Sequence, residues 1–574
     1  MAGEAYPTEP LYRYPWTNLS EAALRQAVDG VAAAGPEPQR AGADLSLAGQ
    51  TLQIATDGGP SLSYRFLTGN RLMLTEPGND PVQAGYGAAT VDHVTFFAHL
   101  IPGTMRGYAV MFDHDSGLAT VVDLWFGSEP RSREVHRHIT HGYVAKDGVA
   151  APEARHEPTA RVEGRGLFWT DDRGQETLEF YASTIYANVV DRTRLDGKFG
   201  YAFPAEYIQL TEDLYFIMRM EAEFSGIATL MLVDMNRLHA AGLRLGFDGA
   251  DKLEYYMFES NAEWLGQIAR FEEFGDVSGN PIKPPSEEKG ARVIYRPFGT
   301  WDKMTRAEVD AVASNDDHVF ARASAMAGHG NPPTGKLAGR ELTIRYDNGP
   351  RLEYRFDSAD SLRWRKDGGA WKTTRYNAWE SAPGVFLFGH LLVGEPQHDG
   401  HIVTMDLDAG LATAFRGYLN TPHVANEAWS ETMFGVVQGS GIPDPGPKRH
   451  EFTHDMLGRC MTWSYSPGLT SMHLYSTPNT VSWIIFTPTG HAGTQWAGPG
   501  EFVKIRDGLY FLYWREDACN GTLGCILVNM RTMHDAGIGY HCGEEGLSLG
   551  PVGAYARHAG RFDIERFFDG KEKA

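Results

Sequence analysis

The chain contains 574 residues, which is enough for several domains, and its content of 42% hydrophobic and 12% aromatic residues is typical of packed, β-rich proteins. Its formal net charge of −21 argues against a protein that binds nucleic acid phosphates. Because the sequence has no apolar run of about 18 residues, we expect no transmembrane helix and no membrane partner.

The cysteines and the first residues of the chain favour a cytoplasmic protein. The 4 cysteines form no CxxC pair, so a disulfide framework or a zinc knuckle is not expected. The first residues lack the basic and apolar segments of a secretory signal. We therefore expect reduced thiols and a cytoplasmic location.

Several motifs occur twice, in the same order along the chain. Tyr64-Arg65-Phe66 returns 290 residues later as Tyr354-Arg355-Phe356, and Arg155-His156-Glu157 returns 294 residues later as Arg449-His450-Glu451. His239, followed by Ala241-Gly242, returns at a shift of 295 as His534, followed by Ala536-Gly537. A shift this nearly constant predicts two copies of one long module.

In the first copy, Ser20 is placed to cap a helix over residues 21–28. Short alternating runs then predict two successive antiparallel meanders. The expected strands are 51–55, 61–66, 93–100 and 108–113, followed by 178–182, 207–220 and 229–234. Spaced apolar residues predict a closing amphipathic helix over residues 262–274.

The second copy repeats this order. Thr305 is placed to cap a helix over residues 306–312. The turn Asp347-Asn348-Gly349-Pro350 between two alternating runs predicts a hairpin. The expected strands are 342–346, 351–356, 385–392 and 402–406, followed by 472–475, 502–514 and 523–529, with a closing helix over 555–568.

These elements predict an all-β protein with short helices. Closure of each meander into an up-and-down barrel would remove its free edges, so we expect four small calycin-like antiparallel barrels in two tandem pairs. A set of β-sandwiches is the structural alternative. The expected domains are a helical preface (1–44), barrel 1 (45–150), barrel 2 with a closing helix (151–290), a linker and helix (291–335), barrel 3 (336–440) and barrel 4 with a closing helix (441–574).

The paired meanders resemble the MoaF family. The N-terminal domain of that family is matched by Asp347-Asn348-Gly349 with Tyr354. Its C-terminal domain is matched by Leu457-Gly458-Arg459 with Trp463, by Leu509-Tyr510-Phe511, and by Val528-Asn529-Met530 with Gly537. The resemblance implies two-domain, calycin-like units, two of which would be fused in this chain.

Barrel 3 also resembles the phenolic acid decarboxylases, single lipocalin-like barrels that work without a cofactor. The Tyr-Asp-Asn-Gly turn of that family is matched at Tyr346, and its catalytic arginine after an aromatic residue is matched by Trp364-Arg365. The sequence departs from the family at the catalytic glutamate, where His390 ends Phe388-Gly389-His390. Carboxylates at the matching position occur in barrels 2 and 4, as Glu212 and Asp507.

His99 and His390 occupy equivalent places in two apolar strands. Alternation along a barrel strand would direct each imidazole into the lumen. Desolvation there would lower the pKa of the histidine and leave a neutral base near pH 7. A hydrogen-bonded core histidine is the alternative interpretation.

Aromatic and charged side chains around His390 make barrel 3 the preferred site. We expect Arg365 and tyrosines to hold a carboxylate or phenolate, and tryptophans to cover a ring. An aromatic core with Arg365 at the rim is the alternative. The candidate residues are Tyr346, Tyr354, Trp364, Arg365, Tyr376, Trp379 and Glu380, with Tyr64 and Tyr86 as the first-copy matches of Tyr354 and Tyr376.

Other ionisable clusters receive different interpretations. Arg155-His156-Glu157 and Arg449-His450-Glu451 lie between paired barrels, where a salt bridge or hinge role is favoured over catalysis. His136 and His138 would share a strand face near His141, which allows a metal site in one copy only. His398 and His401 are expected to be solvated in an Asp/Gly turn.

The leading hypothesis is a cofactor-independent lyase or isomerase that acts on a small apolar or aromatic hydroxy or carboxylic compound. His390 would move a proton during dehydration, decarboxylation or double-bond migration. The alternatives are a small-molecule binding protein without turnover, and a metal-dependent or redox enzyme that uses His136, His138 and His141. The expected partner is the small-molecule substrate, with a homodimer as one possible assembly.

Overall fold

A computed structural model describes most of the chain. The described residues are 19–128, 131–193, 197–221, 226–248, 250–270, 304–313, 324–421, 424–485, 495–516 and 521–569. They divide into two compact units, one made of Leu11–Gly197 with Ala202–Gly266, and the other made mainly of Gln267–Ala574.

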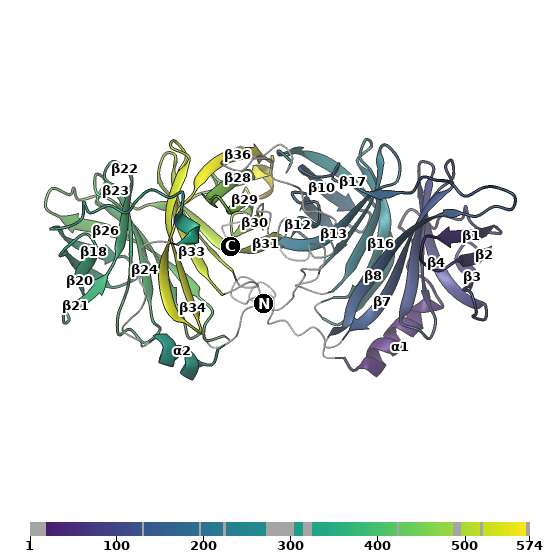
Figure 1. The fold of residues 1–574 in the computed structure, drawn as a ribbon, viewed down its shortest axis with the longest axis horizontal. Coiled ribbons are helices and arrows are strands. Elements are labelled where there is room, and N and C mark those ends of the chain that lie inside the picture. Colours follow the sequence, from purple (N-terminus) through teal and green to yellow (C-terminus); the bar gives the residue numbers. More distant parts are fainter. Residues whose placement is uncertain are drawn as a thin grey trace. The chain divides into compact units, whose positions relative to one another are not determined.

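Barrel one is a closed antiparallel ring in which each strand pairs with its neighbour in sequence and β8 pairs with β1 (Figure 1). Its strands are β1 (Thr51–Thr56), β2 (Leu62–Thr68), β3 (Arg71–Thr75), β4 (Val82–Val91), β5 (Val94–Ile101), β6 (Arg106–Asp113), β7 (Leu118–Ser128) and β8 (Arg131–Val144). The helix α1 (Glu21–Ala32) precedes it, and Ser20 accepts a hydrogen bond from the Ala23 amide, so the predicted cap is confirmed.

Barrel two completes the first unit. Its sheet runs in the order β12-β11-β10-β17-β16-β15-β14-β13-β9, and a further pairing of β12 with β13 closes it. The strands are β9 (Glu157–Pro158), β10 (Arg165–Asp171), β11 (Glu176–Phe180), β12 (Tyr186–Asp191), β13 (Tyr201–Gln209), β14 (Leu214–Met220), β15 (Ala228–Asp234), β16 (His239–Phe247) and β17 (Leu253–Gln267).

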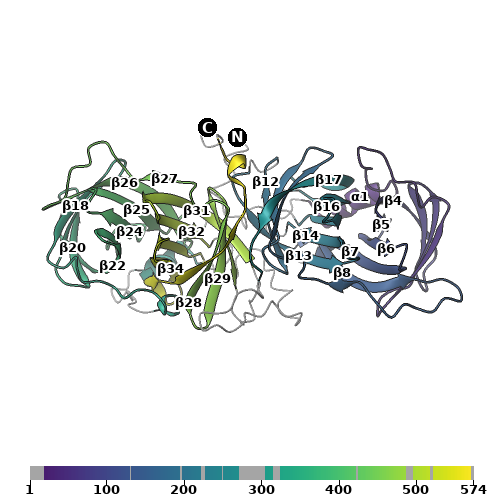
Figure 2. The ribbon, with the colours of Figure 1, turned by 90° about the horizontal axis from the view of Figure 1, so that it is seen from above.

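Barrel three opens the second unit, after α2 (Arg306–Ala313), whose first turn Thr305 caps as predicted. Its sheet runs in the order β21-β20-β19-β18-β26-β25-β24-β23-β22. The end strands β21 and β22 are joined by Tyr376 alone, so chain continuity completes the ring. Figure 2 shows β18, β20, β22 and β24 of this barrel from above. The strands are β18 (Glu341–Tyr346), β19 (Arg351–Phe356), β20 (Ser361–Lys366), β21 (Lys372–Arg375), β22 (Asn377–Ala382), β23 (Val385–Leu391), β24 (Gly400–Asp406), β25 (Leu411–Tyr418) and β26 (Trp429–Gly439).

Barrel four closes through a pairing of β31 with β32. Its strands are β27 (Glu451–Phe452), β28 (Arg459–Ser466), β29 (Leu469–Thr477), β30 (Thr480–Ile485), β31 (Gln495–Arg506), β32 (Leu509–Arg515), β33 (Leu523–Asn529), β34 (His534–Gly543), β35 (Gly546–Val552) and β36 (Tyr555–Arg561). Two single turns of 3₁₀ helix, η5 (Ala325–Ala327) and η6 (Glu565–Phe567), flank the sheets of the second unit.

The prediction of an all-β protein built from several barrels is confirmed, but both closing helices were wrong. The segment predicted as helix from residue 262 continues β17 as far as Gln267, and residues 271–274 of that prediction lie outside the described residues. The segment predicted from residue 555 forms β36 and the single turn η6. Both β17 and β36 are needed to complete their rings, and pairing on two sides outweighs local helix propensity.

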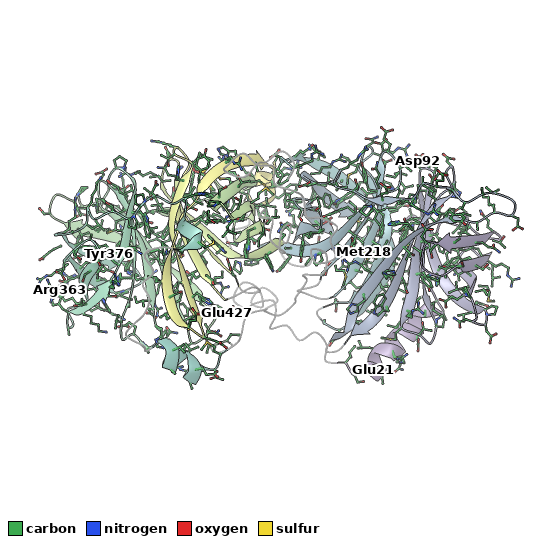
Figure 3. All side chains as sticks on the ribbon, in the orientation of Figure 1. Glu21, Asp92, Met218, Arg363, Tyr376 and Glu427 are labelled. Atoms are coloured by element: carbon green, nitrogen blue, oxygen red, sulfur yellow. The ribbon has the colours of Figure 1, made fainter. Side chains whose placement is uncertain are left out.

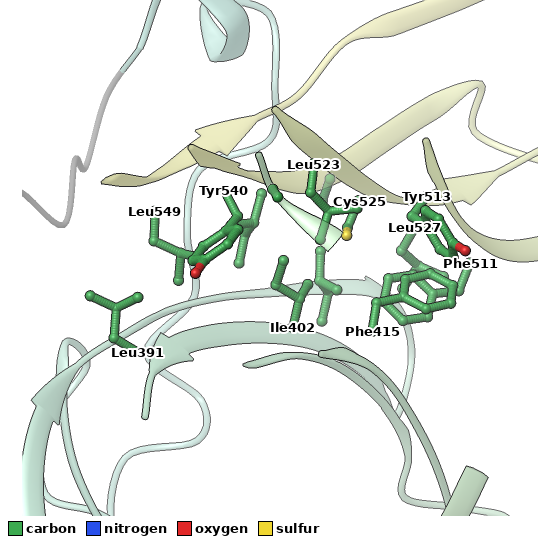
Figure 4. Close-up of a cluster of buried hydrophobic side chains, with 14 of the residues drawn as sticks. Leu391, Ile402, Phe415, Phe511, Tyr513, Leu523, Cys525, Leu527, Tyr540 and Leu549 are labelled. Carbon is green, nitrogen blue, oxygen red and sulfur yellow. The ribbon is translucent and has the colours of Figure 1, made fainter. Parts of the chain in front are cut away.

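Barrels three and four share an apolar core on the outer face of β23, β24 and β25. Figure 4 shows Phe415 lying against Phe511, and the two rings stack with centroids 4.0 Å apart. Ile402, Leu523 and Tyr540 are buried in the same cluster. Residues that alternate with these on β24 and β25 therefore point into barrel three.

Among the residues that the structure describes, no helix has the length and the apolar character needed to cross a membrane.

Candidate functional site

Four ionisable side chains form one row across the interior of barrel three. The strand register pairs His390 with His401, His401 with Arg416, and Arg416 with Glu431. Directly paired residues project from the same face of a sheet, so all four face the lumen near one end of the barrel. His390 and His401 are both 0% exposed, which confirms the predicted inward direction of His390.

The prediction that His401 is solvated in a turn was wrong. Gly400 opens β24, where it pairs with Leu391 and Gly417, and a Cβ there would come within 2.6 Å of the ring of Tyr540. His401 follows as a strand residue that faces inward. His398 does lie before the strand, where its Nε2 is 2.9 Å from Asp310 Oδ1.

A chain of hydrogen bonds connects the two histidines through two tyrosines. The Tyr346 hydroxyl lies 3.0 Å from His401 Nε2, and the Tyr354 hydroxyl lies 2.9 Å from His401 Nδ1. Tyr354 is also 3.3 Å from His390 Nε2, and His390 Nδ1 is 3.0 Å from the carbonyl of Leu391. All four side chains are buried.

The direction of each hydrogen bond follows from the protonation states. Burial lowers the pKa of His390 to about 4, and burial together with the neighbouring His390 and Arg416 lowers the pKa of His401 well below its usual value, so both rings are neutral at pH 7. The Leu391 carbonyl can only accept, so His390 donates from Nδ1 and accepts at Nε2. Tyr354 must then donate to His390 and accept from His401, which accepts from Tyr346.

A cavity of about 240 Å³ lies beside this chain of hydrogen bonds. His401 is a member of the hydrogen-bond chain and also lines the cavity. Its wall combines apolar side chains with acids and bases and with the hairpin turn after Tyr346. The residues that line it are Asn348, Gly349, Pro350, Leu352, Lys366, Leu392, Asp399, His401, Arg416, Glu431 and Met433. His390 is outside that set, so it touches the cavity only through Tyr354 and His401.

Asp399 and Arg416 are the charged groups that sequence reasoning missed. Arg416 donates from Nε to Asp399 Oδ2 at 2.8 Å, from Nη1 to Glu431 at 3.0 Å and from Nη2 to Gln397 at 2.9 Å. Asp399 is 3% exposed, and its Oδ1 has no hydrogen-bond partner. Their signal was the β24–β25 register, which places Arg416 beside His401 once Gly400 is recognised as a strand residue.

Arg365 does not point into the barrel, so the predicted inward clamp was wrong. The burial pattern of β20 alternates, with Leu362 and Trp364 buried and Arg363 and Arg365 facing outward. Arg365 is 32% exposed, donates to Glu353 at 2.5 Å and lies 4.8 Å over the ring of Trp371. Figure 3 shows Arg363, on the same face of β20, at the outer surface of the barrel.

The remaining aromatic candidates in barrel three have structural contacts. Trp364 is in the barrel interior with its ring 6.1 Å from that of His390. Tyr376 donates to the carbonyl of Ser358 at 2.8 Å. Trp379 lies in the core shared with barrel four and donates to the Asn331 carbonyl.

Glu380 also lies away from the cavity. It pairs with Lys336 and accepts from the Gly384 amide at 3.1 Å. The structure therefore brings together His390, Tyr346, Tyr354 and Trp364 of the predicted site, and separates Arg365, Trp379 and Glu380 from them.

Barrel one has a similar interior with different chemistry. The Tyr64 hydroxyl lies 3.3 Å from His99 Nε2, and burial lowers the pKa of His99 to about 4. The row that starts at His99 continues through Tyr108, Asp123 and His138. Tyr86 donates to the carbonyl of Thr68 at 3.0 Å, as Tyr376 does to Ser358.

The repeated Arg-His-Glu motifs anchor turns rather than reacting groups. Arg449 donates from Nε and Nη2 to the two carboxylate oxygens of Asp347, both at 2.7 Å, and Arg155 makes the same bidentate pair with Asp57. His450 and His156 are buried beside Thr413 and Thr120, and burial lowers the pKa of each to about 4. Glu451 and Glu157 are exposed residues of β27 and β9.

The three histidines proposed as metal ligands do not converge. His136 stacks on Trp125, His138 lies in the barrel-one row, and His141 Nδ1 lies 3.1 Å from the Thr120 hydroxyl. Within the described part of the chain, the group with three potential ligand atoms in range is His93, Asp113 and Asp115.

The carboxylates proposed for barrels two and four are exposed. Glu212 lies between β13 and β14, and Asp507 pairs with Lys504 at the turn before β32. The buried groups there are different ones. In barrel two, Arg219 lies 2.8 Å from Glu179, and Arg244 lies 2.7 Å from Glu221. In barrel four, burial raises the pKa of Asp535 to about 7 and lowers that of His473 to about 3.

The family comparison agrees with this arrangement in the second half of the chain. No curated protein matches the sequence. The model of the MoaF N-terminal domain matches residues 319–421, which contain the row from β23 to β25, and the model of the MoaF C-terminal domain matches residues 450–561. That the first half is another such unit stays a prediction. With both domains present in family order, the second half of the chain contains a complete two-domain unit of the MoaF family.

Proposed function

We propose that barrel three is the active site of a lyase or isomerase that acts by acid–base catalysis, without a cofactor, on a small apolar or aromatic hydroxy or carboxylic compound. One observation carries the proposal. His401, at the centre of the buried Tyr–His–Tyr–His chain, is also part of the wall of the 240 Å³ cavity, beside a buried carboxylate oxygen that has no partner. Acid–base catalysis requires such groups within hydrogen-bond reach of a bound substrate.

The geometry suggests a role for each residue. In a dehydration, Asp399 Oδ1 would take a proton from the substrate carbon and return it to the hydroxyl group, which would leave as water. His401, which lines the cavity and is held 3.0 Å from the Tyr346 hydroxyl, would orient the substrate beside Asp399. Tyr354 and His390 are positioning residues, because they fix the ring of His401 in one orientation and one protonation state.

The enclosed position of these groups supports the same proposal. His401 and Asp399 are almost completely buried, and Leu352, Leu392 and Met433 form apolar parts of the wall. At buried positions such as these two, fixed hydrogen bonds and charges act more strongly on a reacting group than they do in solution.

The test is a turnover screen of hydroxycinnamates, terpene alcohols and related hydroxy compounds, followed spectroscopically. With any substrate found, we expect Asp399→Asn and His401→Phe to lower kcat by about 100-fold or more, the range of one acid–base group. The controls in barrel one are Tyr108→Phe, at the register position of His401, and Asp123→Asn, at the carboxylate of the corresponding ion pair, and both should keep activity. If the barrel-one variants lose turnover and the barrel-three variants keep it, the proposal fails.

A specific observation favours a second function, binding without turnover. Both nitrogens of His401 already have partners, and His390 is outside the wall of the cavity. A protein of this kind would hold its ligand by shape and a few polar contacts. It would bind a compound from the screen, lose affinity in Asp399→Asn, and convert none of it.

The cysteines support a cytoplasmic location, which we propose with the activity. Cys460, Cys525 and Cys542 are buried free thiols, and burial raises the pKa of each. Thiols in this state are typical of a reducing compartment. Fractionation of the native host would test this placement.

A further inference from the structure

We propose that the compound bound in barrel three presents a hydrogen-bond donor, a hydroxyl or ammonium group, to Asp399, and that the site rejects carboxylates. This rests on the proposed function in that it concerns the same cavity, and it narrows the substrate class from hydroxy or carboxylic compounds to donors.

The cations of the cavity are already occupied. Arg416 uses each of its three nitrogens on a different acceptor, namely Asp399, Glu431 and Gln397. Lys366 donates to Glu395 at 2.9 Å. A carboxylate ligand would have to share one of these cations with the acid already bound to it, and so would gain less charge interaction than it would beside an unpaired cation.

Two acidic residues of the lining keep unused capacity to accept hydrogen bonds. Asp399 Oδ1 is buried and has no partner, while the other oxygen of the same carboxylate is fixed by Arg416. Glu431 also lines the cavity and is bound to Arg416 through one oxygen. A buried acceptor without a donor costs about 1–3 kcal/mol, and a ligand hydroxyl or ammonium group would remove that cost.

His401 reinforces this selectivity. Its two nitrogens are held by Tyr346 and Tyr354, and the ring is neutral, so it offers no positive charge to an anion. A donor group on the ligand therefore has Asp399 available, whereas a carboxylate would meet that fixed carboxylate at short range.

Barrel one shows how the preference for donors over carboxylates can be inverted while the ion pair is kept. Its row places Asp123 at the register position of Arg416, and Arg106 at that of Asp399. Arg106 Nη2 lies 3.0 Å from Asp123 Oδ2, close to the 2.8 Å of the Asp399–Arg416 pair. The double variant D399R/R416D copies this order into barrel three.

The experiment uses three probes of nearly equal size, 4-fluorobenzyl alcohol, 4-fluorobenzylamine and 4-fluorobenzoate, with binding followed by ¹⁹F NMR on the full chain. One substituted ring suits a cavity slightly below the about 300–1,000 Å³ of drug-sized sites. We expect the alcohol and the amine to bind at least about tenfold more tightly than the benzoate, which equals about 1.4 kcal/mol. Asp399→Asn should remove this difference, and D399R/R416D should reverse it.

The control variant and each negative outcome of this experiment give a different result. R106D/D123R makes the same exchange in barrel one and should leave the order of affinities unchanged. If benzoate binds as tightly as the other two, the donor inference is overturned and the site of the proposed function stands. If none of the three binds, the cavity is not a ligand site and both proposals fall. Should D399R/R416D not fold, Asp399→Asn alone decides the question.

Discussion

Barrels one and three place the same tyrosine–histidine contact on the same strands and differ in the residue beside it on the neighbouring strand. Tyr64 and His99 are 3.3 Å apart, and so are Tyr354 and His390. The next position is Tyr108 in barrel one and His401 in barrel three. Tyr108 donates out to Glu76 at 2.6 Å, whereas His401 continues a buried chain to Tyr346.

The ion pair next to this position has a similar distance in both barrels, but the acidic and the basic residue have exchanged register positions. Arg106–Asp123 in barrel one corresponds to Asp399–Arg416 in barrel three. In barrel one the carboxylate is 25% exposed, and in barrel three it is nearly buried. The comparison teaches that a barrel of this kind can retain its scaffold and its pairing while the chemistry that it presents to the lumen changes.

The largest expected effect is acid destabilisation of the second half. Burial lowers the pKa of His390 from 6.5 to about 4, so between these values the unfolded chain binds a proton that the folded one does not. The stabilising contribution of the neutral His390 ring is therefore complete above pH 6.5 and is lost as the pH falls toward 4. That loss is on the order of 3 kcal/mol, and His401 adds to it in the same direction.

Urea unfolding at pH 7.5 and 5.0 would measure this effect. His390→Leu should weaken the pH dependence of the second half, and His99→Leu should weaken that of the first. Among the described residues, the second half has four histidines whose pKa is lowered (His390, His401, His450 and His473) and the first half has three (His99, His141 and His156), so the second half should lose more stability. Equal losses in the two halves would break the comparison.

The next effect concerns the exchanged ion pair. Arg416→Gln should lower the free energy of unfolding by about 3 kcal/mol, because it leaves Asp399 as a buried charge without its partner. Arg106→Gln should cost less than about 1 kcal/mol, since water can solvate Asp123. Denaturant midpoints of the two variants provide the measurement. A cost for Arg106→Gln as large as that for Arg416→Gln would contradict this account of burial.

A smaller effect is expected at the residue that distinguishes the two rows. His401→Leu should cost about 2 kcal/mol, because the buried Tyr346 hydroxyl loses its acceptor. Adding Tyr346→Phe should recover part of that loss. Tyr108→Phe should cost about 1 kcal/mol or less, since the Glu76 carboxylate it releases is partly exposed. No recovery in the double variant would mean that the hydrogen bond does not carry the effect.

The smallest effect concerns the arginines that hold the two hairpin turns. Arg449→Gln and Arg155→Gln should each cost less than about 1 kcal/mol, because both pairs are partly exposed. Only Arg449→Gln should also weaken probe binding in barrel three, by about twofold, since Asp347 leads directly into the turn that lines the cavity. Binding of 4-fluorobenzyl alcohol to both variants measures this, and an equal effect of Arg155→Gln would remove the link to the turn.

The sequence predicted the fold well where alternation was strong. The strands 351–356 and 523–529 are found at the predicted bounds, and the inward direction of His390 followed from its place in an apolar strand. The same rule, applied to neighbours, would have shown that Trp364 and Arg365 cannot both enter the lumen, because adjacent residues of a strand face opposite sides.

The rest of the site depended on contacts distant in sequence. Gly400 was interpreted as part of an Asp/Gly turn, and its pairing with Leu391 and Gly417 makes it a strand residue. Without that strand, His401, Asp399 and Arg416 could not be placed beside His390. The closing helices failed for a similar reason, since the partners that make β17 and β36 strands lie far along the chain.

The Leu391 carbonyl at the end of the hydrogen-bond chain has a spectroscopic consequence. Since that oxygen has no proton to give, a single arrangement satisfies every member, and His390 and His401 must both be protonated on Nδ1. The side-chain ¹⁵N spectrum should therefore contain two imidazoles of the same tautomer, with no exchange between forms at neutral pH. Their signals would report on the interior of barrel three before any substrate is known.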